Sequence, residues 1–159
     1  MELPPLDKMW PNYPIGTPAE VAVLVGGPVG DNITKYNWET CCIRLSRSLN
    51  IAGRPIEGFS DMANPYMPGP KAKVRASKGD DNKWYIYSCY DLREYLNNRF
   101  GRAKKFGSYE KSDLSEAKGI IMFGFRHTDL WNGSEVRYNT DFTDGTKKVQ
   151  EILVWQTPS

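Results

Sequence analysis

The chain has 159 residues, a length that suits one domain, and we therefore treat residues 1–159 as a single domain. Hydrophobic residues make up 40% of it and charged residues 25%, as in an ordinary globular protein. The formal net charge of +2 is too small to indicate a nucleic-acid partner, and the absence of an apolar run of about 18 residues excludes a membrane span. Residues 1–10 also lack an apolar run, so no Sec signal peptide is expected.

A short helix is predicted near the start of the chain. Residues 17–20, Thr-Pro-Ala-Glu, form a capping-box arrangement with proline at the first helical position. The helix is expected over residues 19–25, and Gly26-Gly27-Pro28 ends it. Residues 30–32, Gly-Asp-Asn, are expected to continue the loop.

A second helix is predicted to open at residues 37–39 and to run to about Ala52. Cys41 and Cys42 fall in its first turns. Residues 53–80 are rich in proline and glycine, and they predict a long loop of a kind that often borders a binding site.

A strand is predicted over residues 83–87, followed by a third helix. Asp91 is expected to cap that helix, with Glu94 three residues later and Gly101 after its end. Helices therefore dominate the first two thirds of the chain.

The last third is typical of a meander of antiparallel strands. Apolar strands are predicted at residues 119–123, 127–131 and 149–155. Asn132-Gly133 is a pair favoured in two-residue hairpin turns, so residues 134–138 are expected to return beside the preceding strand. Because helices come first and strands later, the expected class is α+β, with N-terminal helices packed on an antiparallel β-sheet.

The placement of Cys41 and of the only histidine, His127, favours nucleophilic catalysis. The unpaired N–H groups and the dipole of a helix start favour a thiolate at Cys41. His127 opens a strand in the β-rich half, and a helix-borne cysteine facing a strand-borne histidine can attack a carbonyl and deliver a proton to the leaving amine. A third polar group usually orients the imidazole, and four carboxylates follow His127: Asp129, Glu135, Asp141 and Asp144.

Other site chemistries find less support in the sequence. The three cysteines, Cys41, Cys42 and Cys89, are too few and odd in number for a disulfide framework. One histidine and two adjacent cysteines fall short of the ligand spacing that zinc needs, so no metal site and no cofactor is expected. The glycines at 26–30 make no phosphate loop, because no Gly-Lys-Ser/Thr follows them.

Local sequence adds a specific resemblance. Three blocks resemble the type VI secretion amidase effectors of family four, and they occur in that family's order: residues 30–34 and 40–50 (Gly-Asp-Asn-Ile-Thr, then Thr-Cys-Cys-Ile-Arg-Leu-Ser with Leu49-Asn50), residues 81–92 (Asp-Asn-Lys-Trp-Tyr-Ile-Tyr with Asp91-Leu92), and residues 118–133 (Lys-Gly-Ile-Ile, then His127 with Leu-Trp-Asn-Gly). The resemblance implies that Cys41, rather than Cys42, is the nucleophile and that His127 is the base. The family's acidic third residue lies roughly a dozen residues beyond the histidine, and Asp141 is the nearest match.

The resemblance also implies a papain-like cysteine amidase fold and an activity. Such enzymes cleave the amide between γ-D-glutamate and meso-diaminopimelate in peptidoglycan stems. As antibacterial toxins they pass through the type VI secretion apparatus from the producer's cytoplasm into the periplasm of a rival cell. A cognate immunity protein neutralises them in the producer.

The sequence leaves open both the third catalytic residue and the exact function. For the third residue we rank Asp141 first, Glu135 second and Asp129 third, because a neighbour two residues along the same strand should stand beside the imidazole ring and not behind it. The oxyanion is expected to meet backbone N–H groups near the helix start, including that of Cys41. Competing functions are another papain-like hydrolase or deamidase, and a non-catalytic module that binds the cell wall.

Overall fold

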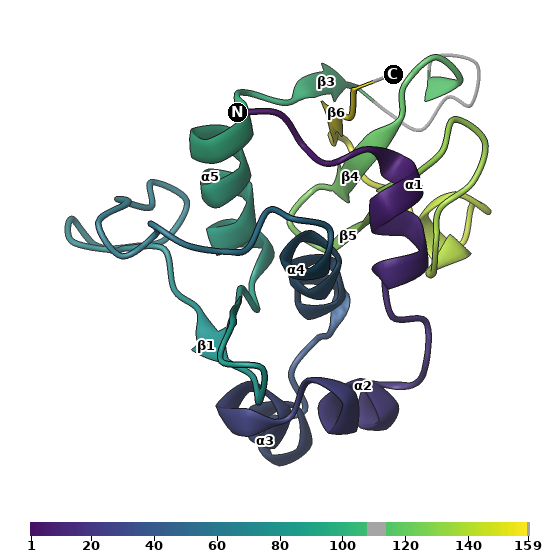
Figure 1. The fold of residues 1–159 in the computed structure, drawn as a ribbon. Helices are drawn as coiled ribbons and strands as arrows, with labels where there is room; N and C mark the ends of the chain where they lie inside the picture. Colours follow the sequence, from purple (N-terminus) through teal and green to yellow (C-terminus); the bar gives the residue numbers. More distant parts are fainter. Residues whose placement is uncertain (108–113, 159) are drawn as a thin grey trace.

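A computed structural model describes residues 1–107 and 114–158, and an antiparallel sheet beside a central helix forms its frame (Figure 1). The sheet has four strands in the order β3-β6-β4-β5, and every neighbouring pair is antiparallel. Its strands are β3 (Lys104–Phe106), β4 (Gly119–Phe123), β5 (His127–Trp131) and β6 (Ile152–Gln156). This arrangement confirms the expected α+β class.

Helices and a small hairpin make up most of the remaining structure. The helices are α1 (Leu6–Met9), α2 (Pro18–Val25), α3 (Gly27–Tyr36), α4 (Cys41–Ile51) and α5 (Cys89–Phe100), with 3-10 turns η1 (Trp10–Asn12) and η2 (Thr140–Phe142). A two-stranded sheet pairs β1 (Ser77–Lys78) with β2 (Trp84–Tyr85). Among the described residues, no helix has both the length and the hydropathy needed to cross a membrane.

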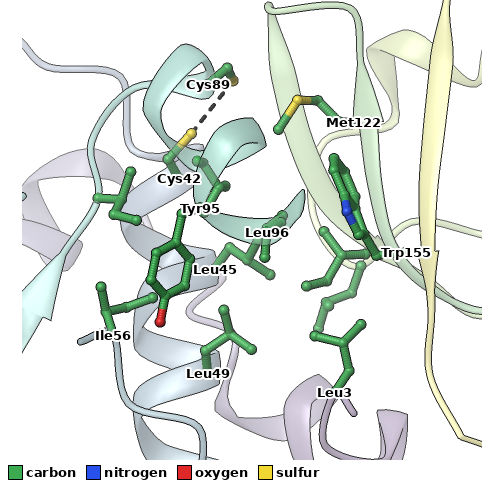
Figure 2. Close-up of a cluster of buried hydrophobic side chains, with 14 of the residues drawn as sticks. Leu3, Cys42, Leu45, Leu49, Ile56, Cys89, Tyr95, Leu96, Met122 and Trp155 are labelled. Atoms are coloured by element: carbon green, nitrogen blue, oxygen red, sulfur yellow. Dashed lines mark hydrogen bonds between the residues drawn. The ribbon is translucent and has the colours of Figure 1, made fainter. Parts of the chain in front are cut away.

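Helix α4 lies at the centre of the molecule, with α5 on one side and the pair β4–β5 on the other (Figure 1). Leu45 and Leu49 of α4 are fully buried, and they pack in one cluster with Leu96 of α5, Met122 of β4 and Trp155 of β6 (Figure 2). Truncation of such a leucine to alanine usually costs about 2–5 kcal/mol, because a cavity remains. The core therefore fixes the helix that carries Cys41 against the sheet that carries His127.

The first helix forms as predicted, but the loop expected after it is a helix. Thr17 and Glu20 make the predicted capping box at the start of α2. Gly26 has a φ of 57° and a ψ of −162°, which ends α2, and α3 begins at the next residue. Proline suits the first turn of a helix, so Pro28 helps to start α3, and residues 30–32 lie inside it.

The third helix begins earlier than predicted. Ser88, not Asp91, is its N-cap, and the Ser88 side chain accepts a hydrogen bond from the backbone N–H of Asp91. The Asp91 side chain is fully buried and binds Asn64 and Arg75 of the long loop instead. Cys89 is consequently the first residue of α5, at the same end of the helix as the cap.

The strands of the last third agree with prediction except in one segment. Strands β4 and β5 have the predicted bounds, while β6 is shifted to Ile152–Gln156. Residues 134–138 do not return as a strand, and only a single bridge joins Trp131 to Val136. The N–H groups at 137–139 bond to the Asp129 carboxylate, a side-chain acceptor that competes with strand pairing.

Candidate active site

Cys41 is the first residue of α4 and is half-buried. The first N–H groups of a helix have no acceptor within the helix, and the helix dipole places partial positive charge beside them. The N-cap residue is Thr40, and its side chain accepts no hydrogen bond from these N–H groups. They are therefore available to a thiolate or to an oxyanion at Cys41.

The surroundings of Cys41 favour the thiolate. Hydrogen bonds from Cys42 and Cys89 lower the pKa of the Cys41 thiol well below its ordinary value, burial opposes them, and a hydrogen bond and positive charge from His127 lower it further. Burial raises the pKa of Cys42 well above the ordinary value. Of these two adjacent cysteines, Cys41 is the one whose surroundings favour a thiolate.

His127 opens β5 and is only 4% exposed. Its ring lies nearly parallel to that of Phe142, with centroids 5.2 Å apart and planes inclined by 8°, and Phe123 stacks at 6.0 Å. Burial lowers the pKa of His127, but hydrogen bonds with Asp129 and Cys41 outweigh it and raise the pKa to about 9. The imidazolium is thus the favoured form at neutral pH.

Asp129 holds the far side of the imidazole. Its Oδ2 lies 2.8 Å from His127 Nε2, and the Asp129 side chain is fully buried. The carboxylate accepts four backbone N–H groups at 2.8–3.2 Å, from Leu130, Arg137, Tyr138 and Asn139. Its position is therefore set by the backbone, and Nδ1 is the ring nitrogen left to face Cys41.

The structure does not bring Asp141 or Glu135 to His127. Asp141 lies on η2, where its half-exposed carboxylate is 3.7 Å from Lys147 Nζ. Glu135 is exposed in the turn after Asn132, whose side chain accepts the Glu135 N–H. The structure favours Asp129 over the order ranked from sequence, because strand alternation describes only the direction of Cβ, and the loop at 137–139 draws the Asp129 carboxylate back to the ring.

Arg44 is a further residue of this region whose place the sequence did not indicate. Arginine side chains usually keep the charged head in water, yet Arg44 is 1% exposed. Its guanidinium donates to Thr40 Oγ1 at 2.9 Å and to the Pro14 carbonyl at 3.0 Å, and it lies 4.0 Å from the centroid of the Tyr138 ring. Arg44 thereby links the start of α4 to the loop that holds Asp129.

The side chains of Cys41, His127 and Asp129 together supply the groups that nucleophilic catalysis needs. A thiolate at a helix start, an imidazolium beside it and a carboxylate behind the ring can carry out acyl transfer, in which sulfur attacks a carbonyl and the ring moves the proton. Free N–H groups at the start of α4 can stabilise the oxyanion. The unit needs no cofactor for that chemistry.

Comparison with known proteins gives consistent matches. The family model Tae4, described as "Type VI secretion system (T6SS), amidase effector protein 4", matches residues 37–155. The effector Tae4 from Salmonella typhimurium, solved in complex with the immunity protein Tai4 from Enterobacter cloacae, is 29% identical with a TM-score of 0.80, over 98% of this chain and 99% of that chain. Tae4 from Enterobacter cloacae, solved as a Tae4–Tai4 complex, is 23% identical with a TM-score of 0.80 over the same shares of the two chains. No curated protein matches the sequence.

Proposed function

Because this chain belongs to the Tae4 family of type VI secretion amidase effectors, with the papain-like fold of that family, we propose that it is a cysteine amidase that hydrolyses peptide bonds of peptidoglycan. The observation that carries the proposal is the alignment of Cys41, His127 and Asp129, with Asp129 Oδ2 2.8 Å from His127 Nε2. The family supports the amidase class, and the geometry supports cysteine chemistry within it.

The reaction follows from the positions of these groups. Cys41 Sγ attacks the amide carbonyl carbon, and the oxyanion that forms accepts hydrogen bonds from N–H groups at the start of α4, including that of Cys41. The protonated Nδ1 of His127 gives its proton to the leaving nitrogen as the C–N bond breaks and a thioester remains. Water then attacks the thioester while His127 takes up a proton, and the acid leaves with Cys41 restored as a thiolate. Asp129 keeps Nε2 protonated throughout, so that Nδ1 exchanges the proton.

The bond cleaved is proposed to be that between γ-D-glutamate and meso-diaminopimelate, on the resemblance of the catalytic blocks to the family. Purified sacculi digested with the enzyme should yield muropeptides cut at this bond, as identified by mass spectrometry. Release of whole stem peptides from the glycan would instead indicate cleavage at the N-acetylmuramoyl-L-alanine amide. Release of ammonia without any chain cleavage would indicate a deamidase.

The choice between the adjacent cysteines has its own test. Cys41→Ala should abolish release of muropeptides from sacculi while the variant still folds and sediments with them. Cys42→Ala should retain most of the activity, with thermal unfolding measured because Cys42 is buried in the core. An inactive Cys42→Ala beside an active Cys41→Ala would overturn the assignment of the nucleophile, and undiminished lysis by both would remove the cysteine mechanism.

Delivery and neutralisation are proposed to follow the family. The solved relatives are effector–immunity complexes, which supports a cognate immunity protein as partner. We propose that the enzyme leaves the producer's cytoplasm through the type VI apparatus and acts in the periplasm of the target cell. The expected result is lysis when the protein is directed to the periplasm of Gram-negative cells, with no lysis when it stays in the cytoplasm.

A further inference from the structure

Three thiols gather where the starts of α4 and α5 meet. Cys41 Sγ and Cys42 Sγ are 3.9 Å apart, and Cys42 Sγ and Cys89 Sγ are 3.5 Å apart. All three sulfur atoms lie within 4.8 Å of one another. Figure 2 shows Cys42 and Cys89 facing each other between the two helices. The proposed reaction uses only one of these three thiols, so the cluster calls for a second explanation.

The spacing of the sulfur atoms matches a tetrahedral metal ion. Thiolate sulfur lies about 2.3 Å from zinc, and tetrahedral geometry then places two sulfur ligands about 3.8 Å apart. The two measured separations, 3.9 Å and 3.5 Å, fall on either side of that value. The third pair, Cys41 Sγ and Cys89 Sγ, lies within 4.8 Å, so one ion could be held by all three sulfur atoms once that pair closes toward about 3.8 Å.

His127 lies next to the cluster on the side of Cys41. It acts electrostatically on the Cys41 thiol, and its Nε2 is held by Asp129. An imidazole that binds zinc commonly has a carboxylate on its other nitrogen, because the carboxylate fixes the tautomer and raises ligand basicity. Only the three thiols lie within 4.8 Å of one another, so His127 would have to move toward the ion to complete a Cys₃His set, which is a frequent structural zinc site.

We propose that Cys41, Cys42 and Cys89 form a binding site for Zn²⁺ that reversibly inhibits the enzyme, and that His127 moves in as the fourth ligand when the ion binds. Soft thiolates select zinc over calcium or magnesium, which prefer oxygen ligands. Binding releases the thiol protons to solvent, and no electron is transferred. Since the ion engages both the nucleophile and its base, the occupied enzyme has no free thiolate. This consequence rests on the proposed function, whereas binding itself does not.

Sequence reasoning excluded a metal site because it weighed only the two adjacent cysteines and the histidine. Cys89 lies 47 positions beyond Cys42, and only the packing of α5 on α4 supplies it as a ligand. The competing explanation is that three cysteines merely fill a core as small apolar groups. The two explanations differ in whether the thiols bind a metal ion with one-to-one stoichiometry.

Metal binding is measured without reference to activity. The reduced, metal-free protein is titrated with Co²⁺, whose thiolate charge-transfer absorption reports sulfur ligands directly, and then with Zn²⁺. One equivalent of Co²⁺ should produce the band, and one equivalent of Zn²⁺ should remove it. Cys89→Ala should weaken Zn²⁺ binding by more than about tenfold, since even loss of an outer-shell partner costs about 10–100-fold. A wild-type protein without the band, or with a band that survives Cys89→Ala unchanged, would overturn the proposal.

Met122→Leu provides a matched control. It removes a buried sulfur atom from the same core, outside the thiol cluster, while nearly conserving volume (Figure 2). This variant should bind Co²⁺ and Zn²⁺ as the wild type does. If Cys89→Ala does not fold, Cys42→Ala serves in its place, with the same expected loss of affinity.

Inhibition is measured on sacculi, with each variant compared with its own rate in the absence of zinc. Equimolar Zn²⁺ should reduce wild-type hydrolysis at least tenfold, and a chelator should restore it. Cys89→Ala should need a correspondingly higher Zn²⁺ concentration. An active enzyme that equimolar Zn²⁺ leaves uninhibited would refute the zinc site and leave the amidase intact. Co²⁺ binding by a protein that never cleaves sacculi would refute the amidase and leave the zinc site intact.

Discussion

Asp129→Asn tests the reading of the active site most directly. The substitution keeps the size of the side chain but removes its charge and one acceptor. The asparagine oxygen can still accept the N–H groups of Leu130, Arg137 and Tyr138, which all reach Oδ1. The new NH₂ group then occupies the place of Oδ2 and donates to His127 Nε2. The ring proton moves to Nδ1, so the neutral ring has the wrong tautomer to act as base toward Cys41.

The expected magnitude follows from the pKa of His127. A pKa of about 9 against an ordinary value of 6.5 corresponds to about 3 kcal/mol of preference for the protonated ring. Asp129 supplies only part of that preference, since Cys41 also raises the pKa of His127, so its loss lowers the rate by at most about 10²-fold, and the wrong tautomer extends the loss toward about 10⁴-fold. The NH₂ group also faces the N–H of Asn139, which costs about 1–3 kcal/mol of folding stability.

The assay is the rate of muropeptide release from sacculi, at a temperature where thermal unfolding shows each variant to be folded. Asp141→Asn is the matched control, because it makes the same chemical change at a half-exposed carboxylate paired with Lys147. The control should stay within about 0.5 kcal/mol of wild-type stability and within twofold of its rate. Near-normal turnover in Asp129→Asn, beside a large loss in Asp141→Asn, would refute the assignment and restore the ranking made from sequence.

Three further predictions concern pH and stability. The value of kcat/KM should fall as pH rises through about 9, where His127 loses its proton. The same fall should come at lower pH in Asp129→Asn, and a fall at an unchanged pH in this variant would contradict the role of Asp129. Arg44→Met should lower the free energy of unfolding by about 1–3 kcal/mol in denaturant titrations, because the partly buried Pro14 carbonyl and the buried Thr40 hydroxyl lose their donor, and a change below about 0.5 kcal/mol would contradict the linking role of Arg44. Thr17→Ala should cost about 1 kcal/mol and lower Tm by a few degrees in calorimetry without affecting hydrolysis, and an equal loss of hydrolysis would show that α2 contributes to the site.

Much of the local structure was predictable because its causes are local. The capping box of α2 depends on residues three positions apart, and the apolar run of β4, bounded by glycines, favours a strand from its own residues. The errors arose where a distant group competed with a local preference. Asp91 was expected to cap a helix but is bound by Asn64 and Arg75, and residues 134–138 were expected to pair as a strand.

The sequence by itself determined the class of the fold, the strand that opens at His127 and the helix that carries Cys41 near its start, although that helix begins at Cys41 and not at residues 37–39. Helix periodicity, capping and apolar alternation act over a few residues, so a single chain displays them. Only the tertiary structure decided which carboxylate meets the imidazole and which thiols meet one another. Asp129 reaches His127 because the backbone at 137–139 presents N–H groups to its carboxylate, and Cys89 reaches Cys42 because α5 packs on α4. Such contacts depend on how whole elements pack, and no spacing along the chain encodes them.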